Sequence, residues 1–273
     1  MKIYQLTLVA LITLFFSSCE DVIQVDLETA MPRLVIEASI QWQKGTSGSD
    51  QKVKLTTTTG FYNQTIPTVS GATVFITNSN NVVFDFIETP NSGEYLCSSF
   101  IPEIDQTYVL TVLLNGQTYM ATETLKSVVP ITTIEQNNEG GFTGEEIEIK
   151  TYFDDPADAD NYYMFKYKNS ISEIPKFEVS EDEFYQGNTF FDLYSNEDIA
   201  SNDSIDITIY GISKRYYEYM NKIISIAGSN GGSPFSTPPA TVKGNIVNTI
   251  NSKNYPLGYF NVSETDTRNY IIQ

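Results

Sequence analysis

"TYVLTVLLNGQTYMATETL" (107–125) decides the fold, because two alternating segments flank the dipeptide Asn115-Gly116. Asn-Gly is the strongest short-range hairpin signal, since both residues tolerate the positive φ that a tight turn requires. Further short segments rich in β-branched and aromatic residues precede this hairpin. They cover 33–42, 51–59, 71–77, 82–88 and 94–98. About seven short strands at this spacing predict an immunoglobulin-like or transthyretin-like sandwich over residues 32–126.

"SVVP" (127–130) indicates a linker, and strand-like segments resume after it. One helix is expected over 213–227, where Ser213 can cap the first turn and Tyr216, Met220 and Ile223 recur on one face. That face is expected to pack against a sheet, with a ligand site as the alternative. The chain is therefore predicted to be mainly β, with an N-terminal sandwich and a C-terminal β domain (131–273) that carries one α-helix. The strand-like segments of that domain cover 131–136, 145–153, 161–168, 184–194, 204–212, 241–248, 257–263 and 268–273.

The first residues have the form of an export signal, in which an apolar run extends to Phe16 and two serines precede Cys19. A cysteine at this point resembles a bacterial lipobox, where the thiol takes a diacylglyceryl group. Residues 1–18 are therefore predicted to be a lipoprotein signal peptide, Cys19 the lipid-carrying residue and 19–31 a tether. More than one acyl chain gives stable anchoring. The alternative is a secreted protein in which this cysteine has no role.

Two acidic residues, Glu20 and Asp21, follow the cysteine directly. Acidic residues in this place resemble the surface-export signal of Bacteroidota lipoproteins. The expected location is therefore the outer membrane, with the chain lipid-anchored and facing the cell surface. The alternative is that the two acids simply begin a solvated tether.

The composition excludes several classes of protein. The formal charge is −18 at pH 7 without a basic stripe, which argues against nucleic acid as a partner. The absence of histidine removes Ser-His-Asp and Cys-His catalytic groups and histidine-ligated metals. No phosphate-binding loop or dinucleotide fingerprint is present, so no cofactor is expected. Cys97 has no disulfide partner once Cys19 is acylated, and its place in "GEYLC" favours a buried strand position over a reactive thiol.

An acidic string at 154–160 is a candidate calcium site, because hard cations bind clustered carboxylates. Its members are Asp154, Asp155, Asp158 and Asp160. The string lacks the glycine and the distal glutamate of an EF-hand loop, so a solvated turn is the better interpretation. Ser204 lies in an Asp-Ser-Ile triplet that matches Bacteroidota O-glycosylation sites, or marks an ordinary turn before a strand.

Aromatic residues in or beside turn-rich segments are the candidates for contact with a glycan or peptide ligand, or with a protein partner. They are Trp42, Phe61, Tyr62 and Phe235. Simple packing is the alternative for each of them. Carboxylates are numerous enough to form a glycosidase pair, but nothing in the sequence selects two of them. The sequence therefore indicates binding more than catalysis.

Seven segments resemble one family along nearly the whole chain after the signal. They are "SSCEDVI" (17–23), "PRLVIEASI" (32–40), "VSGATVFIT" (69–77), "TYVLTV" (107–112), "YFDDPADADNYYMFKYK" (152–168), "ISKRYYEYMNKI" (212–223) and "PPATVKGNIVN…PLGYFNVS" (238–248 and 256–263). Together they resemble a Bacteroidota outer-membrane lipoprotein family that is catalogued only as a domain of unknown function. The Pro-Pro, Gly-Asn and Leu-Gly-Tyr-Phe block is the most specific part.

The resemblance implies a location and a partner. Members of that family are commonly encoded beside SusC-like TonB-dependent transporters, and no catalytic residues are established that could be carried over. The expected function is therefore a non-catalytic accessory subunit that captures or gates a nutrient for such a transporter. The alternatives are a free-standing adhesion or scaffold lipoprotein, or a cryptic glycan hydrolase.

Overall fold

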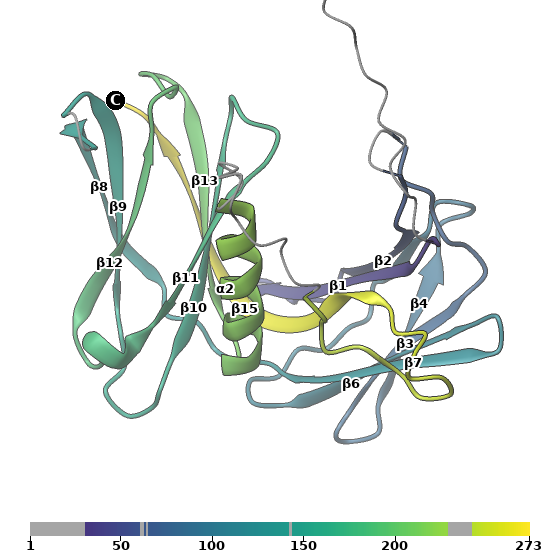
Figure 1. Ribbon diagram of the computed structural model, residues 1–273. Coiled ribbons are helices and arrows are strands. Elements are labelled where there is room, and N and C mark those ends of the chain that lie inside the picture. Colours follow the sequence, from purple (N-terminus) through teal and green to yellow (C-terminus); the bar gives the residue numbers. More distant parts are fainter. Residues whose placement is uncertain (1–30, 61–62, 64, 142–143, 229–241) are drawn as a thin grey trace, which may run out of the picture. The chain divides into compact units, whose positions relative to one another are not determined.

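The computed structural model describes residues 31–60, 63, 65–141, 144–228 and 242–273 (Figure 1). Pro32–Gln273 forms one compact unit. The described residues of this unit form a twelve-stranded sheet, a three-stranded sheet and a single α-helix. The prediction of a mainly β chain with an N-terminal sandwich and one helix is confirmed for this part of the chain.

The first seven strands enclose an apolar core between two layers. They are β1 (Leu34–Gln43), β2 (Gln51–Thr57), β3 (Thr73–Asn78), β4 (Val83–Glu88), β5 (Glu94–Cys97), β6 (Thr107–Leu114) and β7 (Gln117–Thr124). Alternate side chains point inward, as Ile36, Ala38 and Ile40 do in β1. β4 pairs with β3 and, at its end, with β5, so it carries the sheet from one layer to the other. Cys97 is buried in this core, as expected.

The hairpin at 107–124 forms as predicted. β6 and β7 pair from Thr107 opposite Thr124 to Leu114 opposite Gln117, which leaves a two-residue turn. Asn115 has a φ of 49° and Gly116 a φ of 73°, the left-handed conformations that such a turn needs. Local turn chemistry thus fixes the register of the β6–β7 pair.

The second half packs part of the large sheet against the three-stranded sheet. β10 (Tyr162–Asn169), β11 (Lys176–Glu181) and β13 (Ser204–Gly211) extend the large sheet, and a short 3-10 helix, η2 (Asp182–Phe184), follows β11. β8 (Ile131–Gly140), β9 (Glu146–Asp154) and β12 (Thr189–Asn196) form the small sheet in the order β12-β9-β8. The core between them is aromatic, with the ring of Phe153 5.1 Å from that of Tyr163.

The helix α2 (Lys214–Gly228) covers the other face of β10 and β11. Its start is capped as predicted, because the backbone N–H of Tyr216 donates to Oγ of Ser213 at 3.2 Å. Tyr216 is buried against Tyr259, with the two ring centroids 4.8 Å apart. The expected packing of the tyrosine-rich face against a sheet is therefore confirmed.

The last long strand, β15 (Leu257–Ile271), runs through both halves of the large sheet (Figure 1). Its first part is parallel to β1, and its second part is antiparallel to β13. The sequence predicted two strands here, over 257–263 and 268–273. The structure keeps the strand continuous by giving the buried acids partners: Glu264 accepts from the backbone N–H of Val128, and Asp266 from that of Ile131, both at 2.9 Å.

Three residues of the predicted second domain, Ile246, Phe260 and Val262, belong to the core of the first sandwich. A short strand, β14 (Val247–Asn248), also pairs with β7. The hydrogen-bonded sheet is therefore continuous across the division drawn at 127–130. The division into separate folding domains stays a prediction.

The Gly-Asn and Leu-Gly-Tyr-Phe segments meet where β15 begins. Asn245 is 3% exposed, and its side-chain amide pairs with the backbone of Phe260 as a neighbouring strand would. It donates to the carbonyl of Phe260 and accepts from its N–H. A Cβ at Gly244 would overlap the carbonyl of Gly258, and one at Gly258 would overlap the carbonyl of Ile36. This block therefore has a structural explanation in the close approach of three backbone segments.

The carboxyl of Asp192, which lies between the two sheets, makes stability depend on pH. The hydroxyl of Tyr167 donates to Oδ2 of Asp192 at 2.7 Å. Burial raises the pKa of Asp192 to about 6, although the bond from Tyr167 opposes that shift. Because the folded state then binds this proton more tightly than the unfolded chain, stability should increase as the pH falls from above 6 towards 4.

Asp192→Asn is expected to stabilise the protein by about 1–2 kcal/mol at pH 7.5, since it removes the cost of a desolvated charge and keeps an acceptor for Tyr167. Urea unfolding at pH 7.5 and pH 5 measures this, and the gain should be smaller at pH 5. Asp158→Asn, at an exposed position, is the control and should change little. A net loss of stability for Asp192→Asn at pH 7.5 would contradict the assignment.

Candidate functional site

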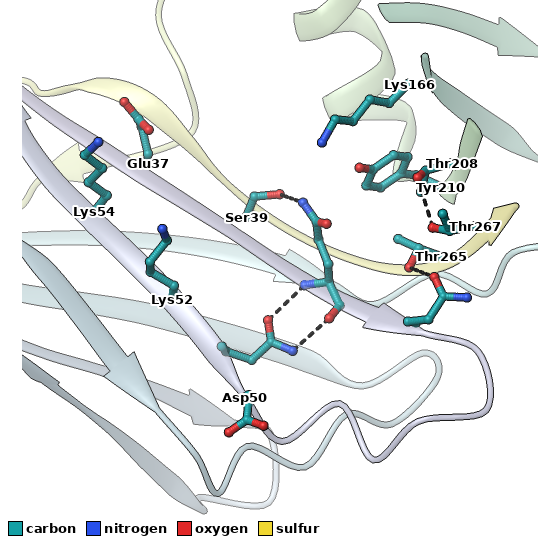
Figure 2. Close-up of a pocket in the computed structure, with 13 residues that line it drawn as sticks. Glu37, Ser39, Asp50, Lys52, Lys54, Lys166, Thr208, Tyr210, Thr265 and Thr267 are labelled. Carbon is teal, nitrogen blue, oxygen red and sulfur yellow. Dashed lines mark hydrogen bonds between the residues drawn. The ribbon is translucent and has the colours of Figure 1, made fainter. Parts of the chain in front are cut away.

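A polar groove of about 620 Å³ crosses the solvent-facing side of the large sheet (Figure 2). Its lining comes from β1, β2, β10, β13 and β15, which are strands from both halves of the unit. On β1 the outward-facing Glu37, Ser39 and Gln41 contribute, while their neighbours Ile36, Ala38 and Ile40 face the core. The same strand thus builds the core with one face and the groove with the other.

The groove exists because β1 and β2 stop pairing early. Their backbones pair only from Leu34 opposite Thr57 to Glu37 opposite Lys54. Beyond that point the side chain of Gln51 bridges the strands, accepting from the N–H of Gln41 at 3.0 Å and donating to its carbonyl at 2.8 Å. A side chain in place of a direct backbone pair leaves room between the strands and holds the wall of the groove in one geometry.

The hydroxyl and amide groups of the groove are largely satisfied among themselves. Gln41 donates to Ser39 at 3.2 Å, and the hydroxyls of Thr208 and Thr267 lie 2.9 Å apart. The first bond lies within β1 and the second crosses from β13 to β15, and both are drawn as dashed lines in Figure 2. The walls are therefore ordered before any ligand arrives, which lowers the entropy cost of binding.

Three lysines face this groove in a chain with 34 acidic and 16 basic residues. Lys52 and Lys54 extend from β2 on one side, and Lys166 extends from β10 on the other (Figure 2). Lys52 pairs with Glu94 at 3.1 Å. Among the described residues, neither Lys54 nor Lys166 has a carboxylate within ion-pair distance, although Glu37 faces Lys54 in register.

An apolar annex of about 350 Å³ continues from the groove beneath α2. Its walls are Met164, Tyr216, Tyr219, Met220 and Tyr259, and Tyr219 and Tyr259 have ring centroids 4.6 Å apart. The annex and the polar groove share a boundary. That boundary comprises Glu37, Ser39, Gln41, Lys166 and Tyr210.

Tyr210 stands at the boundary between the polar groove and the annex. The residue is 2% exposed, and its hydroxyl has no hydrogen-bond partner among the described residues. In Figure 2 the hydroxyl of Tyr210 and the amine of Lys166 point toward the same part of the groove. Burial raises the pKa of Tyr210 to about 12, so the phenol keeps its proton and can donate a hydrogen bond.

The family of the chain follows from its sequence over almost its full length. A family model described as "Domain of unknown function (DUF4249)" matches residues 20–269. The chain belongs to the DUF4249 family. No match is found among the curated proteins.

Solved structures resemble this DUF4249 chain only weakly. The two fibronectin type-III domain segment from chicken tenascin is 9% identical and covers 66% of this chain and 90% of its own, with a TM-score of 0.21. A DUF4785 family protein from Legionella pneumophila is 8% identical, with coverage of 67% and 54% and a TM-score of 0.27. A cytokine receptor complex is 5% identical, with coverage of 65% and 82% and a TM-score of 0.26.

Trp42, a predicted ligand-contact residue, does not line the groove, although the residues on either side of it do. It lies on the inward face of β1, is partly buried against the first core, and donates from Nε1 to the carbonyl of Thr46 at 2.9 Å. Its neighbours Gln41 and Gln43 line the groove instead. The alternation of strand side chains explains the difference, and Trp42 therefore holds the following loop in place.

The acidic string does not come together as a cation site. Asp155 is buried and accepts from Tyr163 at 2.6 Å and from the N–H of Gly187 at 3.1 Å, while Asp154 accepts from Thr189. Burial raises the pKa of Asp155. In the described part of the chain, no three acidic or cysteine side chains gather to hold a metal ion. Asp155 thus supports the interior of the second half.

Ser204 is the first residue of β13, and its carbonyl accepts from the N–H of Ser170 at 2.9 Å. Asp203 accepts from the N–H of Ala200 at 2.8 Å and so closes the turn that precedes the strand. O-glycosylation of Ser204 stays a prediction.

Six other predicted site residues lie outside the described residues. They are Cys19, Glu20, Asp21, Phe61, Tyr62 and Phe235.

No helix in the described residues has the length and apolar content that a membrane crossing requires.

The groove residues Lys54, Lys166 and Tyr210 were not among those that the sequence singled out. A partial signal for Lys54 lies in "QKVKL" (51–55), where lysines alternate with core residues. Nothing in the sequence places β10 and β13 in the same sheet as β2, so the three side chains could not be grouped in advance.

Proposed function

We propose that this chain is a surface-exposed outer-membrane lipoprotein that captures or gates a nutrient for a SusC-like TonB-dependent transporter, without catalysing a reaction. The observation that carries the binding role is the pre-ordered groove, with an adjoining apolar annex and two lysines, Lys54 and Lys166, that have no ion-pair partner among the described residues. Volumes of this size are typical of sites for small organic ligands, which occupy about 300–1,000 Å³. The capture role thus rests on a physical cavity of suitable size.

The location in this proposal rests on Cys19, Glu20 and Asp21, together with the resemblance to Bacteroidota lipoproteins. A lipid at Cys19 would hold the groove at high local concentration beside a barrel, so a weak contact with the transporter would suffice. The tether of residues 19–31 would set the distance between the membrane and the folded unit.

The test is purification of the tagged native lipoprotein from outer membranes in mild detergent, with mass spectrometry of the proteins that accompany it. We expect a TonB-dependent barrel in near-stoichiometric amount. An unrelated outer-membrane lipoprotein with the same tag is the control and should not recover that barrel. Recovery of the lipoprotein alone would contradict the accessory role and favour an adhesion or scaffold protein or a hidden hydrolase.

A further inference from the structure

We propose that the groove binds an amphiphilic organic anion, with its anionic group between Lys166 and Tyr210 and its apolar body in the annex beneath α2. This inference rests on the proposed capture function and names the chemistry of the ligand. It draws on three features of the described residues: an unpaired cation, a phenol hydroxyl free to donate into the groove and an adjoining aromatic cavity.

Lys166 is the reason to expect an anionic group on the ligand. This side chain is partly buried, lines both the groove and the annex, and has no carboxylate partner among the described residues. By contrast Lys44, which is also partly buried, pairs with Glu264 at 2.8 Å. In a chain with twice as many acids as bases, an uncompensated cation in a cavity is best matched by a charge that the ligand brings.

Tyr210 supplies the second donor. Its side chain is 2% exposed and points into the same part of the groove as Lys166 (Figure 2). No hydrogen bond among the described residues occupies this hydroxyl, and the residue lines the groove, so a ligand oxygen can accept from it. An ammonium and a phenol that converge on one point favour an anionic oxygen over a neutral group.

The annex is the reason to expect an apolar body on the ligand. Tyr216, Tyr219 and Tyr259 form a ring cluster, and Met164 and Met220 complete the walls. Methionine adapts its shape and makes favourable contacts with aromatic rings, which suits a planar or branched apolar body. Because the annex opens at Lys166 and Tyr210, one molecule can reach both regions.

Calorimetric titration of the full lipoprotein in lipid nanodiscs tests this with three probes: 2-naphthoate, its uncharged analogue 2-naphthylmethanol, and acetate. We expect 2-naphthoate to bind at least tenfold more tightly than either of the others, because only it has both the charge and the apolar body. Empty nanodiscs correct for partition of the probes into lipid. Absence of 2-naphthoate binding at millimolar concentration would overturn the proposal.

Two variants locate the anionic group. Lys166→Gln should weaken 2-naphthoate binding at least tenfold and leave 2-naphthylmethanol unchanged, and Tyr210→Phe should weaken 2-naphthoate about threefold to tenfold. Lys253→Gln, at an exposed position away from the groove, is the matched control and should bind as the native chain does. Equal affinity of 2-naphthoate for Lys166→Gln and the native chain would contradict the assignment.

The outcomes separate this inference from the proposed function. If 2-naphthoate binds as described but no barrel accompanies the lipoprotein, the ligand site stands and the transport role fails. If a barrel accompanies the lipoprotein and Lys166→Gln has no effect on 2-naphthoate, the transport role stands and the ligand class is wrong.

Discussion

Gly258→Ala is expected to destabilise the protein by at least about 3 kcal/mol, because both the backbone angle and the space at this position exclude a side chain. Gly258 has a φ of 94°, and a Cβ there would overlap the backbone of Ile36. Ile36 cannot move away, since its side chain is fully buried and β1 is hydrogen-bonded to β2 on one side and β15 on the other. Relief would require β15 to separate from β1.

Gly45→Ala is the matched control for that substitution. Gly45 has a similar φ of 80°, but nothing lies within 4 Å of the added Cβ. It should therefore show only the intrinsic cost of the left-handed conformation, about 1–2 kcal/mol. Urea unfolding followed by circular dichroism measures both variants. Equal losses of stability would show that the β1–β15 approach does not restrict position 258.

Cys19→Ala is expected to move the protein almost completely from the membrane fraction to the soluble fraction. The physical reason is that each buried methylene of an acyl chain contributes about 0.8 kcal/mol to membrane binding, so loss of the chains removes the anchor. Fractionation by ultracentrifugation, with immunoblotting of pellet and supernatant, measures the distribution.

Cys97→Ala is the matched control, because Cys97 is the other cysteine of the chain and is buried in the first core. That variant should stay in the membrane fraction, with at most a modest loss of stability from the smaller side chain. Retention of Cys19→Ala in the pellet would mean that another part of the chain holds the protein at the membrane, and the lipoprotein assignment would be wrong.

The sandwich was predictable because its signals are local. The alternation of Ile36, Ala38 and Ile40 with polar neighbours, and the Asn115-Gly116 turn, each specify a strand or hairpin within about ten residues. The helix was predictable for the same reason, through Ser213 and the spacing of its apolar residues.

Other elements were missed where tertiary contacts outweigh local patterns. β11 (Lys176–Glu181) lies in a segment that shows little regularity in the sequence, and it forms because Phe177 and Val179 pack beneath α2. β8 extends to Gly140, through residues that resemble a loop in the sequence, because β9 supplies its hydrogen-bond partners. Neither partner can be inferred from the segment itself.

The groove was beyond sequence analysis for a topological reason. Its walls depend on the parallel pairing of β1 with β15, whose residues are more than two hundred positions apart in the chain. Parallel pairing leaves no turn signal, and the groove side chains are ordinary outward-facing residues of each strand. Lys54, Lys166 and Tyr210 acquire a common role only when the sheet is assembled.

Methyl NMR of methionine tests the central claim, that the annex beneath α2 holds the apolar part of a bound ligand, most directly. Of the four described methionines, Met164 and Met220 line the annex, whereas Met31 and Met120 do not. On titration of the ¹³C-methyl-methionine-labelled protein with 2-naphthoate, the signals of Met164 and Met220 should shift together with one dissociation constant, while those of Met31 and Met120 stay unchanged. Equal shifts of all four signals, or no shift at Met164 and Met220, would contradict the account.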